Sequence, residues 1–175
     1  HGEMAEQILE CFEITPELVL KRQGTSLSDF SIGCRRQLEE VLTARRWSAA
    51  VVQGDTESAF QGALAAFYNH IPVAHVEAGL RTYNLERPFP EEALRQMIGR
   101  LTRLHFPPTA RAEAALLKEN IPAKDIFITG NTVVDAQQWV CRNKGIRRSV
   151  DGRGHLLVTV HRRENWGRDL ETAGQ

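Results

Sequence analysis

The sequence is poor in the features that mark secreted, membrane-spanning and nucleic-acid-binding proteins. Only three of its 175 residues are cysteines, and no CxxC pair occurs, which argues against a disulfide framework and a thiolate metal site. No apolar run approaches the roughly 20 residues that span a bilayer, and the N-terminus lacks a signal-peptide pattern. Lysine and arginine (22) balance aspartate and glutamate (22), so no basic field favours nucleic acid. We expect a cytoplasmic protein with no metal, cofactor, nucleic acid or membrane partner.

The remaining composition is that of a globular protein, with 42% hydrophobic and 25% charged residues. Short β-branched runs alternate with longer segments whose apolar residues recur at helical spacing, which predicts an α/β fold with a parallel sheet. Predicted helices cover residues 5–12, 28–45, 58–68, 91–101, 109–117 and 132–140. Predicted strands cover residues 18–21, 48–53, 72–76, 104–106, 126–129 and 155–160. Strand 48–53 is expected to be buried, and Thr132 with Asp135 is expected to form a capping box.

The order of elements predicts a two-domain α/β protein. Residues 1–141 read as most of the first domain, residues 142–154 as a basic, glycine-containing linker, and residues 155–175 as the start of the second domain, with a helix begun near Gly167. The chain starts within a predicted helix and stops soon after another begins. We therefore expect both ends to be cut from a longer protein.

Polar residues follow three predicted strands. Asp55 comes after strand 48–53, Glu77 after strand 72–76, and His161 with Arg162 after strand 155–160. Ligands of parallel sheets bind beyond the carboxyl ends of the strands. Twenty-two residues separate Asp55 from Glu77, one helix plus one strand, so both carboxylates can face one cleft. The pattern predicts carboxylates on one wall of that cleft and phosphate-binding charge on the other.

Most of the polar residues near these strand ends, Glu77 excepted, also have a structural explanation. Asp55 could cap the following helix, and Glu91 with Glu92 could complement the dipole of the helix after Pro90. Glu91 could also pair with Arg95 one turn later. The run that begins at His161 could be a solvated turn, and His75 is expected to pack within its strand. Glu77 has no obvious structural duty. From residue types alone, a neutral sugar and a nucleotide both remain possible ligands.

Longer stretches of the sequence are more specific evidence than single residue types. The stretches VQGDTESAFQGALAAFYNHIPVAHVEAGLRT, RPFPEEALRQ, LHFPPTARAEAALLKENIP, IFITGNTVVDA and LLVTVHRREN closely resemble, in the same order, bacterial non-hydrolysing UDP-N-acetylglucosamine (UDP-GlcNAc) 2-epimerases. The resemblance covers essentially the whole chain. It implies a GT-B-like architecture of two Rossmann-like domains, of which this chain would hold only part, with the first strand–helix unit missing.

The resemblance also implies an activity, the interconversion of UDP-GlcNAc and UDP-ManNAc for surface polysaccharide precursors. UDP would leave C1 as the C2 proton is removed, and would return to 2-acetamidoglucal after protonation of the opposite face. Such chemistry needs positioned acid/base groups and cations for the diphosphate. The family's catalytic carboxylates match Asp55, Glu77 and Glu91. Its diphosphate-contacting histidine matches His161.

Further contacts and partners are expected from the same resemblance. Arg81, Arg87 and Arg162 are candidates for contact with phosphate, and the first two also for contact with a second UDP-GlcNAc that would act as an allosteric activator. A homodimer is expected for the full-length protein. Three rivals stay open: the hydrolysing relative that releases free ManNAc, a GT-B glycosyltransferase, and a binding module without catalysis. As a fragment, the chain could itself be inactive.

Overall fold

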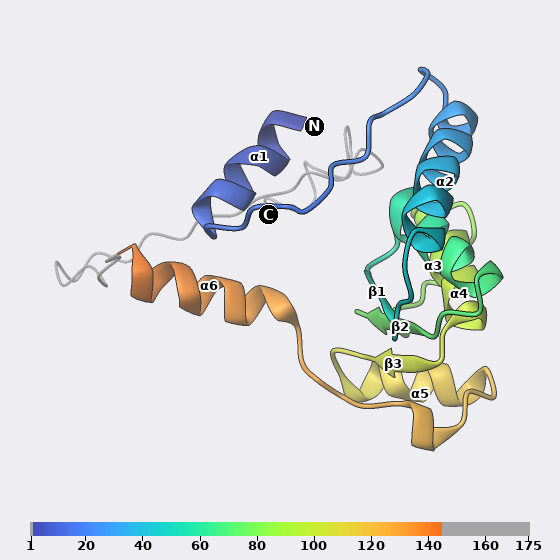
Figure 1. The fold of residues 1–175 in the computed structure, drawn as a ribbon. Helices are drawn as coiled ribbons and strands as arrows, with labels where there is room; N and C mark the ends of the chain where they lie inside the picture. Colours follow the sequence, from blue (N-terminus) through green and yellow to red (C-terminus); the bar gives the residue numbers. More distant parts are fainter. Residues whose placement is uncertain (1, 145–175) are drawn as a thin grey trace, which may run out of the picture. The chain divides into compact units, whose positions relative to one another are not determined.

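A computed structural model describes residues 2–144 of the chain, and Figure 1 shows its ribbon. Residues up to Gln138 form one compact unit, and those from Trp139 onward group as a second. Of the second unit, only the end of one helix is described. The predicted second-domain residues 155–175, with their strand and helix, therefore lie outside the described residues, as does nearly all of the predicted linker.

The predicted alternation of helices and strands is confirmed in most positions. The strands are β1 (Ala50–Gln53), β2 (Val73–Val76) and β3 (Leu104–Phe106). The helices are α1 (Gly2–Cys11), α2 (Leu27–Thr43), α3 (Glu57–Tyr68), α4 (Glu91–Leu101), α5 (Ala110–Lys118) and α6 (Thr132–Asn143), with a 3-10 turn at Ala123–Asp125. None of these described helices has the length and apolar character that a membrane span requires.

Short polar side chains fix where several helices begin. Ser26, Thr56 and Thr109 accept hydrogen bonds from backbone N–H groups in the first turns of α2, α3 and α5, which satisfies donors that a helix start leaves unpaired. The capping box expected from Thr132 and Asp135 is wrong, because Thr132 is already the first residue of α6. The amide of Val133 donates to the side chain of Asn131 at 3.0 Å, so Asn131 takes the capping position.

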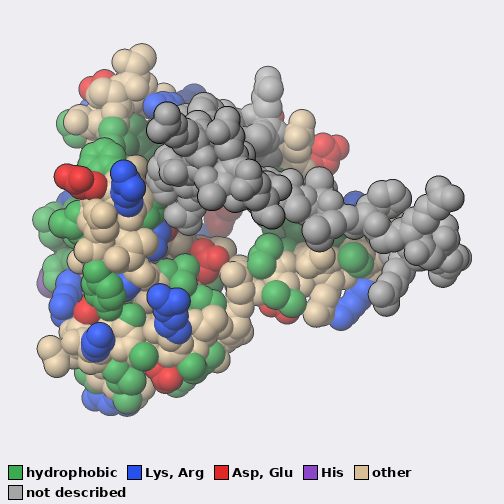
Figure 2. Space-filling view, turned by 180° about the vertical axis from the view of Figure 1, so that it is seen from behind, with side chains coloured by type: hydrophobic (Ala, Val, Ile, Leu, Met, Phe, Trp, Pro, Cys, Tyr) green, Lys and Arg blue, Asp and Glu red, His purple; other side chains and the backbone are tan. Residues whose placement is uncertain are grey.

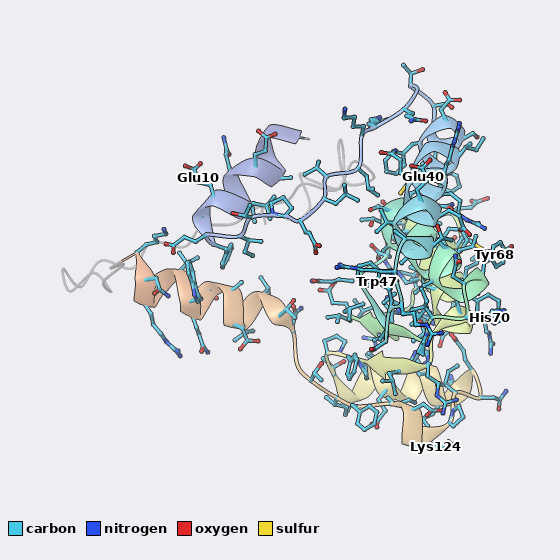
Figure 3. The ribbon with its side chains drawn as sticks, in the orientation of Figure 1. Glu10, Glu40, Trp47, Tyr68, His70 and Lys124 are labelled. Atoms are coloured by element: carbon cyan, nitrogen blue, oxygen red, sulfur yellow. The ribbon has the colours of Figure 1, made fainter. Side chains whose placement is uncertain are left out.

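The three strands form a parallel sheet in the order β1-β2-β3. Gln53 pairs with Val76 in register, and His75 pairs with His105. Figure 1 shows the strands side by side, with α2, α3 and α4 grouped on one side of them. The helix-facing positions of β1 and β2 pack with α3 and α4 in a core made of small and branched residues: Ala59, Ala63, Ala66, Ile71, Val73 and Ile98. Trp47, labelled in Figure 3, packs against this core just before β1.

Three strand predictions differ from the structure. Residues 18–21 form no strand, because the backbone N–H and C=O of Lys21 bond the side chain of Gln37 on α2, each at 2.8 Å. Residues 126–129 make a single bridge, from Ile126 to His105, rather than a full strand. Strand β1 is only half buried, and Val51 on its other face is 70% exposed.

Candidate active site at the carboxyl ends of β1 and β2

The first site residue, Asp55, follows the tight turn that ends β1. The ladder continues one residue past the strand, since the amide of Gly54 donates to the carbonyl of Val76 at 3.0 Å. Gly54 then turns the chain with a φ of +71°, a conformation that glycine adopts without strain. Thr56, not Asp55, caps α3. The capping role considered for Asp55 is therefore wrong, and its half-buried carboxylate is left for another task.

The second residue, Glu77, lies directly beside this turn. A Cβ atom added to Gly54 would come within 3.3 Å of Glu77 Oε2, so the carboxylate of Glu77 lies over the backbone that precedes Asp55. Glu77 has a φ of 64°, which is rare for a residue with a side chain and costs about 1–2 kcal/mol. Backbone strain of this kind gathers at functional sites, where the surrounding structure enforces it.

The third residue, Glu91, is the first residue of α4. Arg95, one turn further along the same face of the helix, forms an ion pair with Asp55. The first turns of α4 therefore lie against Asp55, and Glu91 begins the helix on the same face as Arg95. Among the described residues, the side chains of Glu77 and Glu91 make no ion pair or hydrogen bond, so both carboxylates can act on a ligand.

Arg95 and Glu92 form a buried charge network behind Asp55. Arg95 pairs with Asp55 and, at 3.4 Å, with Glu92, not with Glu91, so the predicted Glu91–Arg95 pair is wrong. Glu92 is completely buried and accepts the backbone amides of Thr82 and Tyr83, both at 3.0 Å. Burial raises the pKa of its carboxyl, yet these hydrogen bonds and one from Gln96 outweigh burial and hold that pKa below its usual range.

Two buried histidines stand side by side on β2 and β3. The Nε2–H of His75 donates to the carbonyl of Gly54 at 2.8 Å, which ties the turn before Asp55 to the centre of the sheet. Burial lowers the pKa of His75, which favours the neutral form of the ring. Burial, together with the neighbouring His75, lowers the pKa of His105 to about 4. His75 thus packs in its strand, as expected, and also holds the site's backbone.

The two arginines expected near phosphate differ in their surroundings. Arg81 is buried and forms two hydrogen bonds to the carboxylate of Glu119, at 2.7 and 2.9 Å, which join the loop after β2 to the end of α5. Arg87 is exposed in the same loop, and its carbonyl accepts a 2.6 Å hydrogen bond from Thr82. Of the two, Arg87 has its guanidinium open to a ligand. His161 and Arg162 lie outside the described residues.

The loop between β2 and α4 begins with a close backbone contact. A Cβ atom added to Gly79 would come within 2.3 Å of the carbonyl oxygen of Ala112 on α5, and Gly79 has a φ of +81°. Only glycine fits this position, and the loop is thereby packed tightly onto α5. Within residues 2–144, no group of three or more His, Cys, Asp or Glu side chains could hold a metal ion.

Sequence reasoning missed the network around Asp55. The spacing of Glu92 and Arg95, three residues apart on α4, signals that they share a face, but nothing in the local sequence links Arg95 to a residue 40 positions earlier. The role of His75 was equally hidden, because its partner is a backbone carbonyl. Figure 2 shows hydrophobic, basic and acidic side chains mixed over the face it presents.

A parallel α/β unit with carboxylates gathered where two adjacent strands end defines a Rossmann-like protein with an acidic site at the usual ligand-binding edge. The comparisons with known proteins then give the family. The sequence model of the UDP-N-acetylglucosamine 2-epimerase family matches residues 1–174, and the chain belongs to this family. The predicted fold class, Rossmann-like and part of a GT-B-like architecture, is confirmed.

Individual relatives agree with this assignment. The UDP-N-acetylglucosamine 2-epimerase of Bacillus subtilis is 42% identical over 176 residues, covering 98% of this chain and 46% of that protein. The crystal structure of UDP-GlcNAc 2-epimerase from Neisseria meningitidis, bound to UDP-GlcNAc, has a TM-score of 0.79 and 41% identity over 83% of this chain and 40% of that one. The S. aureus MnaA–UDP structure has a TM-score of 0.77 and 43% identity over 79% and 37%. The chain spans about half the length of the relatives it matches.

Proposed function

We propose that the complete protein carrying this chain interconverts UDP-GlcNAc and UDP-ManNAc without hydrolysis, to supply surface polysaccharide precursors in the cytoplasm. The observation that carries the proposal is the position of Glu77, whose backbone is strained and whose carboxylate lies beside the Gly54–Asp55 turn. Membership of the epimerase family and the UDP-GlcNAc bound to the Neisseria relative support the choice of substrate.

The proposed reaction needs proton transfer on both faces of one sugar ring. A base removes the C2 proton, the electron pair forms the C1–C2 double bond, and UDP leaves C1 with the bonding electrons. An acid then protonates C2 from the other face, and UDP adds back to C1. Asp55, Glu77 and Glu91 are proposed as the acid/base groups, with base and acid not assigned individually. More than one group is needed because the two faces of the ring are opposite each other.

The departing diphosphate carries negative charge, which cations must stabilise. His161 and Arg162 are proposed to meet it from the second domain, and Arg87 from the exposed loop. Arg81 is proposed to contribute through that loop, whose position its pair with Glu119 fixes. A second UDP-GlcNAc near this loop as an activator, and a homodimer, remain part of the proposal.

Incubation of the complete protein with UDP-GlcNAc in deuterated water tests this function. We expect UDP-ManNAc to form with deuterium at C2 and with UDP retained in the product. Mass spectrometry and NMR measure both features. Release of free ManNAc and UDP would indicate the hydrolysing activity, and sugar transfer to an acceptor would indicate a glycosyltransferase. Binding of the nucleotide sugar without any of these products would leave a binding module and contradict the proposal.

A further inference from the structure

We propose that Arg95 is a positioning residue that fixes the carboxylate of Asp55 for proton transfer, and that Glu92 in turn fixes Arg95. This inference rests on the proposed function, because it assigns a role within the same site. It concerns Glu92 and Arg95, to which the sequence pattern gave only structural explanations and the family resemblance gave no role.

The first step is the geometry of Arg95. Its side chain is nearly buried, at 11% exposure, and one guanidinium nitrogen donates to Oδ2 of Asp55, whose side chain is 28% exposed. An arginine of this kind is always charged, and its planar group presents donors in fixed directions. The contact therefore sets both the orientation and the local field of the Asp55 carboxylate, while leaving its second oxygen, Oδ1, outside the ion pair.

The second step is the anchoring of Arg95 itself. A long arginine side chain has many rotamers, and holding it in one orientation costs free energy. Glu92 supplies the anchor, because it lies three residues earlier on α4 and contacts Arg95 at 3.4 Å. Glu92 is fixed on its other sides by the amides of Thr82 and Tyr83 and by Gln96, at 3.0, 3.0 and 2.8 Å. The orientation of Arg95 is thus set by the loop between β2 and α4.

The third step is the support of the backbone. His75 holds the carbonyl of Gly54 at 2.8 Å, and the Gly54 amide is bonded to Val76 at 3.0 Å. Asp55 is therefore fixed twice, at its backbone by β2 and at its carboxylate by α4. Positioning of a reacting group within about 1 Å can be worth roughly 10²-fold in rate. A pair that served packing alone would not need to end on a partly exposed carboxylate at the ligand-binding edge.

A double-mutant cycle in the complete protein tests the inference. The variants are Arg95→Met, Asp55→Asn and the two combined, with Arg95→Lys and Glu92→Gln as graded changes. We expect Arg95→Met to lower kcat about 10- to 100-fold with KM changed less than about 3-fold. Arg95→Lys should recover part of that loss, because the charge returns without the planar donor group. Glu92→Gln should lower kcat less than Arg95→Met.

The combined variant is decisive. If Arg95 acts through Asp55, Arg95→Met should have no further effect on kcat in the Asp55→Asn background. Multiplication of the two single effects would overturn the inference and indicate that Arg95 acts on the substrate independently. Wild-type kcat in Arg95→Met would also overturn it. Arg100→Met, on the exposed face of the same helix, is the control and should keep wild-type kcat.

Two further measurements separate folding from function. Thermal melting and UDP binding identify any variant that fails to fold. If Arg95→Met fails to fold, the double-mutant cycle is measured with Arg95→Lys and Asp55→Asn instead. Absence of epimerisation in the wild-type protein would overturn the proposed function, and this inference with it. Wild-type epimerisation with multiplicative variant effects would overturn the inference alone.

Discussion

Strands β1 and β2 contribute to two regions that differ in side-chain chemistry. One is the apolar core that they form with α3 and α4, and the other is the candidate site at their carboxyl ends. The core is made of alanine, valine and isoleucine side chains that pack without hydrogen bonds. At the strand ends, the chain has two glycines and one glutamate at positive φ and buries the charged groups of Glu92 and Arg95. The core region contributes stability through burial of apolar surface. The strand ends carry strain and buried charge, which is the usual cost of a preorganised site.

The amino ends of the same strands also differ from their carboxyl ends in the residues that surround them. Tyr68 and His70, labelled in Figure 3, lie at the end of α3, next to the turn that leads into β2. The surface hollow there is lined mainly by apolar and basic residues and contains no carboxylate among the described residues. This hollow therefore differs from the carboxyl ends of β1 and β2, where Asp55 and Glu77 lie and where ligands of parallel sheets bind.

Substitution of Glu77 should give the largest effect on turnover with little effect on stability. We expect Glu77→Gln to lower kcat by about 10²–10⁴-fold, the usual contribution of a positioned acid or base, with little change in melting temperature. Glu77→Gly should lose the same activity while stability stays equal or rises by up to about 1 kcal/mol, because glycine relieves the positive φ. Steady-state kinetics and thermal melting of both variants measure the two effects. Wild-type turnover in Glu77→Gln would remove this residue from the mechanism.

Substitution in the core should give the opposite result. Ile98 is fully buried among small side chains, so Ile98→Ala leaves a cavity and should cost about 2–5 kcal/mol of unfolding free energy. The protein that stays folded should keep kcat within about 3-fold of wild type. Urea denaturation and kinetics at low temperature check both values. A loss of kcat as large as that of Glu77→Gln would mean that packing of the core directly controls the activity of the site.

The sequence predicted the core region better than the site. The strand and helix positions follow from apolar periodicity and from local caps such as Thr56 and Thr109, and these signals lie within a few residues of each other. Asp55 and Glu77 were predicted as candidate site residues because the ends of parallel strands are predictable places for ligands. The Arg95 network was not predictable, since its partners meet only after β1 and α4 are packed together.

A buried histidine offers the last and smallest test, through pH. His105 is 1% exposed, and burial and the neighbouring His75 lower its pKa to about 4 from an ordinary 6.5. Arg81 acts in the same direction, whereas a hydrogen bond to the backbone of Thr102 and the charge of Asp125 oppose the shift. In the unfolded chain, His105 therefore takes up a proton as the pH falls through about 6.5. In the folded chain, it does so only near pH 4. Stability is complete above pH 6.5 and falls as the pH drops through this window.

The expected loss is up to about 3 kcal/mol, since each unit of pKa difference corresponds to roughly 1.4 kcal/mol. Urea denaturation between pH 7.5 and 4 should show this slope in the wild type and a shallower one in His105→Gln, which cannot take up the proton. Carboxylates that protonate in the same range contribute equally to both proteins and cancel in the difference. An unchanged slope in His105→Gln would assign the acid sensitivity to other groups, such as the neighbouring buried His75 or the strand-end carboxylates, and would remove His105 from the pH dependence of stability.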